Sequence, residues 1–282
     1  MPLYRLIVNS KLLIVKSIAV LLILLAPLTF SSLISDHSSL VLGQSPLELS
    51  KENYSLQLTK LNDAHEAYIT AKSNYLSFKS ATAKNDAFIK TKEYLHQVDE
   101  LLTLYLKLVR SFSDNANWQS SNFSKEEQTN IIQEESAFVS DHQAKIDKAT
   151  TLEELTPLAK DLKTHLEEST NPRINKIIVT LDIVQTQSTS EKFNQLSARV
   201  NEFVASRIKA DNKSLLINWQ SETANIKEKT QNNLNLVLQS FTKIKDDRNN
   251  LYQVAQTLKV NKQAKDELKR SKDLFEEMLK VI

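Results

Sequence analysis

Glycine is nearly absent from this chain, which has one glycine in 282 residues. Proteins contain about 7% glycine on average. Tight turns, β-bulges and phosphate-binding loops use it because it adopts positive φ without steric cost. Folds based on hairpins or nucleotide-binding loops can hardly form without it. The composition therefore predicts an all-α fold, in which helices are joined by short polar connections.

The first 43 residues have the pattern of an export signal. Basic residues precede an apolar run over residues 17–30, and the single glycine, Gly43, follows that run. A positive n-region, a short apolar h-region and small residues before the cut are typical of a secretory signal peptide. Cleavage after Gly43 makes Gln44 the first residue. The alternative is an uncleaved membrane anchor over residues 12–30. Both interpretations predict an extracytoplasmic protein, either secreted or anchored in the cytoplasmic membrane.

The charge and cysteine content exclude several classes of function. Beyond residue 43 the chain carries equal numbers of basic and acidic residues. Because neutralisation of phosphates dominates nucleic-acid binding, this balance argues against nucleic acid as a partner. The chain has no cysteine, which excludes disulfides, thiolate metal sites and thiol nucleophiles. A body of this length buries a sizeable core without disulfides.

Apolar residues at seven-residue spacing predict long helices. The segment 45–48, with the sequence Ser-Pro-Leu-Glu, has the residues of a capping box with proline at the first helical position. A seam then runs from Leu47 to Tyr75, and Leu58 and His65 are expected at its alternate positions. This pattern predicts one helix of about 35 residues, roughly 50 Å long.

A second seam covers residues 88–112, after a weaker stretch that allows a turn. Leu102 lies in this seam and is expected in the core. Additional leucines widen the C-terminal half of the seam, so we expect this helix to be the most buried one.

Further stripes predict helices that begin near Ser124, Thr151 and Asn171. In the first of these helices Ile132, Val139 and Ile146 recur every seven residues, with Ile131 and Phe138 beside them. A break is expected near residues 211–212, before a further long helix that reaches Leu251, and Asn261 is the expected cap of the last helix. Residues 185–190 contain no apolar side chain and interrupt the stripe before Phe193.

These patterns together predict an elongated, antiparallel, coiled-coil-like bundle of six or seven helices. No strand alternation of any length is present in the sequence. The polar stretch at residues 169–172 is expected to separate two helical subdomains, residues 44–170 and residues 171–282. Residues 1–43 are the signal peptide or the uncleaved anchor.

The sequence predicts no catalytic, cofactor-binding or metal-binding residue, and therefore no enzyme and no cofactor. Glu93 and His96 match half of the motif of di-iron bundles, but no second Glu-x-x-His follows. Adjacent glutamates on a helix point about 100° apart, unlike the facing carboxylates of glycosidases. Phosphate loops and nucleophile elbows need several glycines. His65 lies in the first seam and is expected to pack in the core.

The run from Tyr68 to Arg110, YITAKSNYLSFKSATAKNDAFIKTKEYLHQVDELLTLYLKLVR, lies behind the signal-like segment. It resembles exported helical proteins of ultra-small bacteria of candidate phyla. The resemblance covers the first half of the body and carries no catalytic motif. It implies an exported helical protein, and it assigns no activity or site.

Two classes of function remain. One is a non-enzymatic cell-envelope scaffold, spacer or protein-binding body, with a protein partner or self-association and with possible membrane attachment through residues 12–30. The other is an extracytoplasmic binding or sensing module with a ligand between its helices. Polar side chains that converge inside an otherwise apolar core, for example His65 with Tyr105, would favour the second class.

Overall fold

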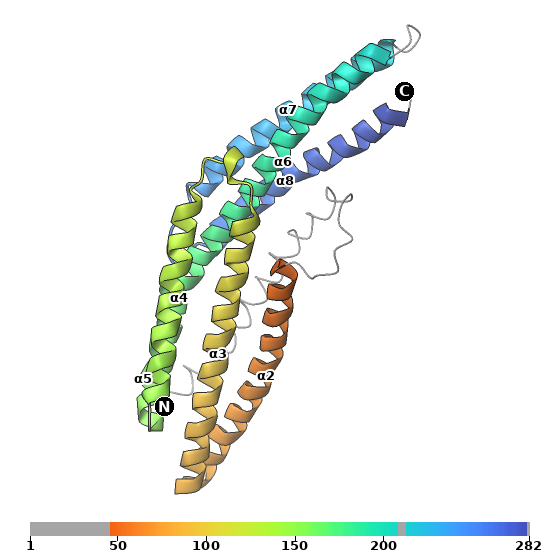
Figure 1. The fold of residues 1–282 in the computed structure, drawn as a ribbon. Coiled ribbons are helices and arrows are strands. Elements are labelled where there is room, and N and C mark those ends of the chain that lie inside the picture. Colours follow the sequence, from red (N-terminus) through yellow and green to blue (C-terminus); the bar gives the residue numbers. More distant parts are fainter. Residues whose placement is uncertain (1–45, 208–212, 281–282) are drawn as a thin grey trace. The chain divides into compact units, whose positions relative to one another are not determined.

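The computed structural model describes residues 46–207 and 213–280, and all regular secondary structure in these ranges is helical (Figure 1). This confirms the predicted all-α fold. Within these ranges no helix is sufficiently long and apolar to span a bilayer. The predicted signal peptide at residues 1–43, its cleavage point and the alternative anchor lie outside the described residues.

The chain forms two compact units, which are described separately. Unit 1 contains residues up to Asn115 together with Glu126–Ile174. Unit 2 contains Ala116–Lys125 together with residues from Asn175 onward. The sequence placed the corresponding boundary between residues 170 and 171, and it did not separate residues 116–125 from their neighbours.

Unit 1 begins with a helical hairpin of α2 (Pro46–Phe78) and α3 (Ala81–Asn115), which pack side by side (Figure 1). Only Lys79 and Ser80 connect them. Lys79 adopts the left-handed conformation, with φ 49°, and its N–H donates to the Tyr75 carbonyl at 2.9 Å. Glycine usually occupies this position after a helix. The Ser80 hydroxyl then caps α3 by accepting the Ala83 N–H at 3.1 Å.

The buried face of α2 differs in part from the predicted seam. Tyr54 and Leu61 are buried as expected. The alternate buried positions lie one residue earlier than predicted, at Gln57, Ala64 and Ala71, whereas Leu58 and His65 are only half-buried. Alanine combines a small side chain with the highest helix propensity. The core row therefore follows the two alanines, and the larger side chains lie beside it.

Two further helices, α4 (Lys125–Lys148) and α5 (Leu152–His165), complete unit 1 with α3. Their shared apolar cluster includes Leu95, Ile146, Ala149 and Leu155. Leu102 is only half-buried, so the prediction that it is a core residue is wrong. The prediction that residues 88–112 form the most buried helix is also wrong, because buried positions are denser on α6 between residues 177 and 184.

The helical path continues from α5 into α6 (Asn171–Arg207) without a break, through a π-helical turn over Leu166–Thr170. The predicted boundary at residues 169–172 therefore does not interrupt the helix. Thr151 caps α5, and Pro157 lies inside that helix. In the π turn the Asn171 N–H donates to the Leu166 carbonyl, five residues back. This wider turn comes just before Pro172, whose nitrogen carries no hydrogen to donate.

Unit 2 packs α6 from Asn175 onward with α7 (Lys213–Phe241), α8 (Leu251–Lys280) and a short 3₁₀ helix, Trp118–Ser120. Each buried core position on α8 follows its predecessor by three or four residues. These positions are Val254, Thr257, Asn261, Ala264, Leu268, Ser271, Phe275 and Met278. This is the heptad spacing of a coiled-coil seam, and side chains of α6 and α7 complete the clusters around it.

Three expectations for this region are corrected. The helix predicted to reach Leu251 ends at Phe241, and Leu251 begins α8 after a polar connection. In that connection the Asp247 carboxylate accepts a hydrogen bond from the Asn249 N–H at 2.9 Å. Such a local hydrogen bond stabilises a turn and competes with helix formation. Asn261 is not a cap, because it is fully buried inside α8. Residues 185–190 do not interrupt the stripe, since Thr186 is buried within α6.

Two isoleucines on α7 test this assignment of the core. Ile226 is fully buried, whereas Ile217 is 58% exposed. We expect Ile226→Ala to lower the free energy of unfolding by about 2–5 kcal/mol, through lost apolar burial and the remaining cavity. Ile217→Ala should change it by less than about 0.5 kcal/mol. Chemical denaturation of both variants checks this, and equal effects would show that α7 has a different buried face.

Candidate functional site

Buried polar residues occupy every second position of the core stripe of α4. Gln128, Glu135 and His142 recur every seven residues, between the apolar residues Ile132, Val139 and Ile146. The sequence predicts the apolar set correctly, but it placed Ile131 and Phe138 beside that set. Half of the inward face of α4 is therefore polar. A buried ionisable group is costly unless it is paired, so the partners of Glu135 and His142 define the candidate site.

His142 binds acceptors at both ring nitrogens. Its Nδ1 lies 2.8 and 2.9 Å from the two carboxylate oxygens of Asp99 on α3. Its Nε2 lies 3.1 Å from the Leu158 carbonyl of α5. Both the imidazole and the carboxylate are buried, and Asp99 is fully so. The pair therefore links three helices of unit 1 through one side chain of α4.

The bonding of this pair requires a shared proton. A carbonyl oxygen only accepts hydrogen bonds, so Nε2 must carry a hydrogen. The contact between Nδ1 and Asp99 needs a second hydrogen, since neither a bare nitrogen nor a carboxylate can donate one. Burial on its own would lower the pKa of His142, but the hydrogen bond and negative charge of Asp99 raise it above its ordinary value. Burial raises the pKa of the Asp99 carboxyl.

Glu135 is the second buried ion in unit 1, and four donors surround it. It accepts hydrogen bonds from His165 Nε2 at 2.9 Å, from the Thr170 hydroxyl at 2.5 Å and from the Ser169 hydroxyl at 3.1 Å. The fourth donor is Arg173 Nη1, at 2.8 Å. Four hydrogen bonds fill the accepting capacity of an ionised carboxylate.

The π-helical turn explains how these four donors reach one carboxylate. His165 precedes the turn, Ser169 and Thr170 lie in it, and Arg173 follows within the first turn of α6. An extra residue per turn changes the directions in which successive side chains leave the helix. Arg173 also contacts Glu134, the neighbour of Glu135 on α4. These contacts fix the end of α5 and the first residues of α6, all within unit 1, against α4.

Phe138 connects the two ion pairs. Its ring stacks on the His165 imidazole, with ring centroids 3.5 Å apart and planes 12° from parallel. It also lies nearly parallel to the His142 ring, at 6.1 Å. Asp99, His142, Phe138, His165 and Glu135 therefore form one connected cluster inside unit 1, which we call the internal ion-pair cluster.

The residues that the sequence singled out lie elsewhere. His65 packs with Tyr94 at 5.3 Å between ring centroids, and Tyr105 packs with Tyr54 at 6.2 Å, so the convergence of His65 with Tyr105 does not occur. His96 Nε2 lies 3.1 Å from an Asp147 carboxylate oxygen, and Glu93 bridges to Lys90. The two residues of the half-motif Glu93-x-x-His96 thus pair with two different partners.

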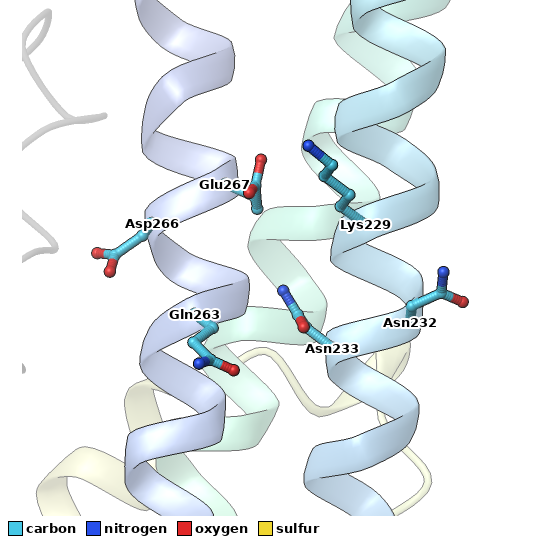
Figure 2. A pocket seen from close by; sticks show the side chains of 6 residues that line it. All are labelled: Lys229, Asn232, Asn233, Gln263, Asp266 and Glu267. Atoms are coloured by element: carbon cyan, nitrogen blue, oxygen red, sulfur yellow. The ribbon is translucent and has the colours of Figure 1, made fainter.

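Unit 2 has its own polar layer. The fully buried Asn261 amide donates to the Asp182 carboxylate at 2.7 Å and to the Thr186 hydroxyl at 3.0 Å, both on α6. Lys265 completes an ion pair with Asp182. On α7 and α8, Lys229, Asn233, Gln263 and Glu267 project into an open depression between these helices (Figure 2). Asn232 and Asp266 lie at its edges and point away (Figure 2).

Comparison with protein-family models, with curated proteins and with solved structures finds no significant match to this chain. The assessment of the site therefore depends on its geometry. Among the described residues, no three His, Asp or Glu side chains are grouped so that they could hold a metal ion. Within the internal ion-pair cluster, each carboxylate and imidazole is already bound to another protein group. Its chemistry is that of a structural junction.

The Asp99–His142 pair predicts that stability falls as pH rises. The folded state holds the shared proton more tightly than the unfolded chain does. The contribution of His142 is therefore complete below about pH 6.5, the ordinary value for histidine, and is lost as pH rises through its raised pKa. Denaturation between pH 6 and pH 9 should show a slope of at most about 1.4 kcal/mol per pH unit from this proton.

Asp99→Asn is the matched control for this pH dependence. The new amide can donate to a neutral Nδ1 while Nε2 still donates to Leu158, so the bonds are kept without the extra proton. We expect the alkaline loss of stability to disappear in this variant. Asp99→Ala should instead cost about 3–5 kcal/mol, because it leaves a buried partner unpaired. An unchanged pH slope in Asp99→Asn would contradict the assignment.

Proposed function

We propose that this protein is a non-enzymatic, extracytoplasmic helical body that acts as a cell-envelope scaffold or spacer, or as a binding surface for a protein partner. The observation that supports this most is the saturation of the internal ion-pair cluster. Glu135 and His142 are the most reactive types of side chain on the inner face of α4, and both are used to join helices. A body of this kind acts through its outer surface.

The sequence supports the extracytoplasmic part of the proposal. Residues 1–43 have the pattern of a signal peptide, and residues 12–30 could serve as an uncleaved anchor. The charge balance beyond residue 43 argues against nucleic acid as a partner. We therefore propose a protein partner or a second copy of the chain.

A ligand-binding or sensing module is the second candidate, and the depression between α7 and α8 favours it. Glu267 and Lys229 both project into it, and one Glu267 carboxylate oxygen is buried without a hydrogen-bond partner (Figure 2). Small-molecule sites are usually concave and largely apolar. This depression is open and polar, which makes it the weaker candidate.

Expression of the full chain with a C-terminal tag in a bacterial host tests export. We expect tagged protein outside the cytoplasm, and N-terminal sequencing should give Gln44 if the signal is cleaved or the intact terminus if residues 12–30 are an anchor. A chain that stays in the cytoplasm would contradict the proposal.

Crosslinking in intact envelopes followed by pull-down tests the partner. We expect a defined protein, or a second copy of the chain, to be recovered with the tag. Glu267→Gln with Lys229→Gln serves as the control, since these changes should leave a protein contact elsewhere intact. Recovery of a small molecule that these two substitutions abolish would favour the ligand-binding module instead.

A further inference from the structure

The groove between α7 and α8 is bridged by polar contacts at two levels. Arg270 of α8 forms an ion pair with Glu222 of α7. Further along the groove, the hydroxyl oxygens of Ser240 and Thr257 lie 2.9 Å apart. Residue numbers rise on α7 as they fall on α8, so the two helices run antiparallel. The depression described above lies between these two bridges, because its lining residues fall between them on both helices.

Complementary side chains meet at the depression without pairing. Lys229 and Asn233 of α7 project into it, as do Gln263 and Glu267 of α8 (Figure 2). None of these four side chains forms a hydrogen bond or an ion pair with another residue in the described ranges. The lysine and the glutamate carry opposite charges, yet they contact no counterion on either helix.

Two polar atoms at this level of the groove are buried without a partner. One carboxylate oxygen of Glu267 has no hydrogen-bond partner, and neither has the hydroxyl of Thr230, a residue of α7 that is 1% exposed. Buried polar groups in native proteins are nearly always hydrogen-bonded, so an orphaned group indicates a water, an ion or a molecule that satisfies it. An ionised carboxylate only accepts hydrogen bonds. Glu267 therefore needs a donor that the surrounding side chains do not supply.

The lining of the depression restricts the chemical class of that donor. All six side chains around it are charged groups or amides, so it offers no apolar or aromatic surface for a hydrophobic ligand or a quaternary ammonium group. A ligand with a single charge would leave either Lys229 or Glu267 without a counterion. A zwitterion with an ammonium group and a carboxylate matches both. The volume of about 500 Å³ is ample for a small molecule of this kind.

We propose that the depression between α7 and α8 binds a free amino acid with a polar side chain. The ammonium group of the ligand donates to Glu267, its carboxylate accepts from Lys229, and the amides of Asn233 and Gln263 bind its side chain. This inference rests on the second candidate function above and names the ligand class of that site. The export and pull-down experiments do not depend on it, so its failure leaves the scaffold proposal intact.

Saturation-transfer NMR of the full chain, with L-glutamine as the probe, tests the proposal. Putrescine supplies ammonium groups without a carboxylate, and succinate supplies carboxylates without an ammonium group. Glu267→Gln and Lys229→Gln each remove one charge from the depression. Glu276→Gln is the matched control, because Glu276 is another glutamate of α8 and lies 3.6 Å from Lys272 on the same helix.

We expect saturation transfer to L-glutamine, with an affinity that falls about tenfold or more in Glu267→Gln and in Lys229→Gln, since each change removes a charge-assisted hydrogen bond. The affinity should be unchanged in Glu276→Gln. No binding of L-glutamine, as expected if water fills the depression or if Lys229 pairs directly with Glu267, would overturn the proposal. Binding that survives both substitutions would also overturn it, as would tighter binding of putrescine or succinate than of L-glutamine.

Discussion

Burial of side chains that recur every three or four residues holds each unit of this protein together. On α8 the pattern extends from Val254 to Met278 without interruption. On α4 it extends from Gln128 to Ile146. A stripe of this kind has no stable exposed state on a single helix, so each helix must pack against others. With one glycine in the chain, the connections are made by polar residues, and at the α2–α3 turn by Lys79 in a left-handed conformation.

Polar groups within these stripes determine which helices pair and in which register. An apolar stripe tolerates a shift by one heptad, whereas a buried ion does not, because a shift leaves it unpaired. His142 binds Asp99 and Leu158, and Glu135 binds donors from four positions around the π turn. Asn261 has the corresponding role in unit 2 through Asp182 and Thr186. We infer that these groups are kept for specificity of packing.

The sequence was sufficient for the fold class, because shortage of glycine and heptad spacing are local properties of the chain. It also predicted individual core residues such as Tyr54, Leu61 and Ile132. It did not predict Gln57, Glu135, His142 or Asn261 as core residues, since a polar residue is recognised as buried only when its partner is known. The partners of Glu135 come from 30 or more residues away along the chain.

The helix boundaries show the same limitation. Residues 169–172 were expected to end a helix because they are polar and contain Pro172. The π turn removes that conflict by bonding Asn171 to Leu166, and Ser169 and Thr170 are polar because they bind Glu135. The heptad position of Glu135 and His142 on α4 was the available signal. Polar residues that share the period of an apolar stripe should be considered as paired core residues.

The central claim is that the buried acids and imidazoles of unit 1 are occupied by one another and form no reactive or binding centre. Nitrogen NMR of the His142 ring measures this most directly. The account predicts that at neutral pH both ring nitrogens carry hydrogens, because Asp99 and Leu158 accept from them. A neutral ring whose Nδ1 carries no hydrogen, and whose nitrogen signals shift when a ligand or metal ion is added, would contradict it.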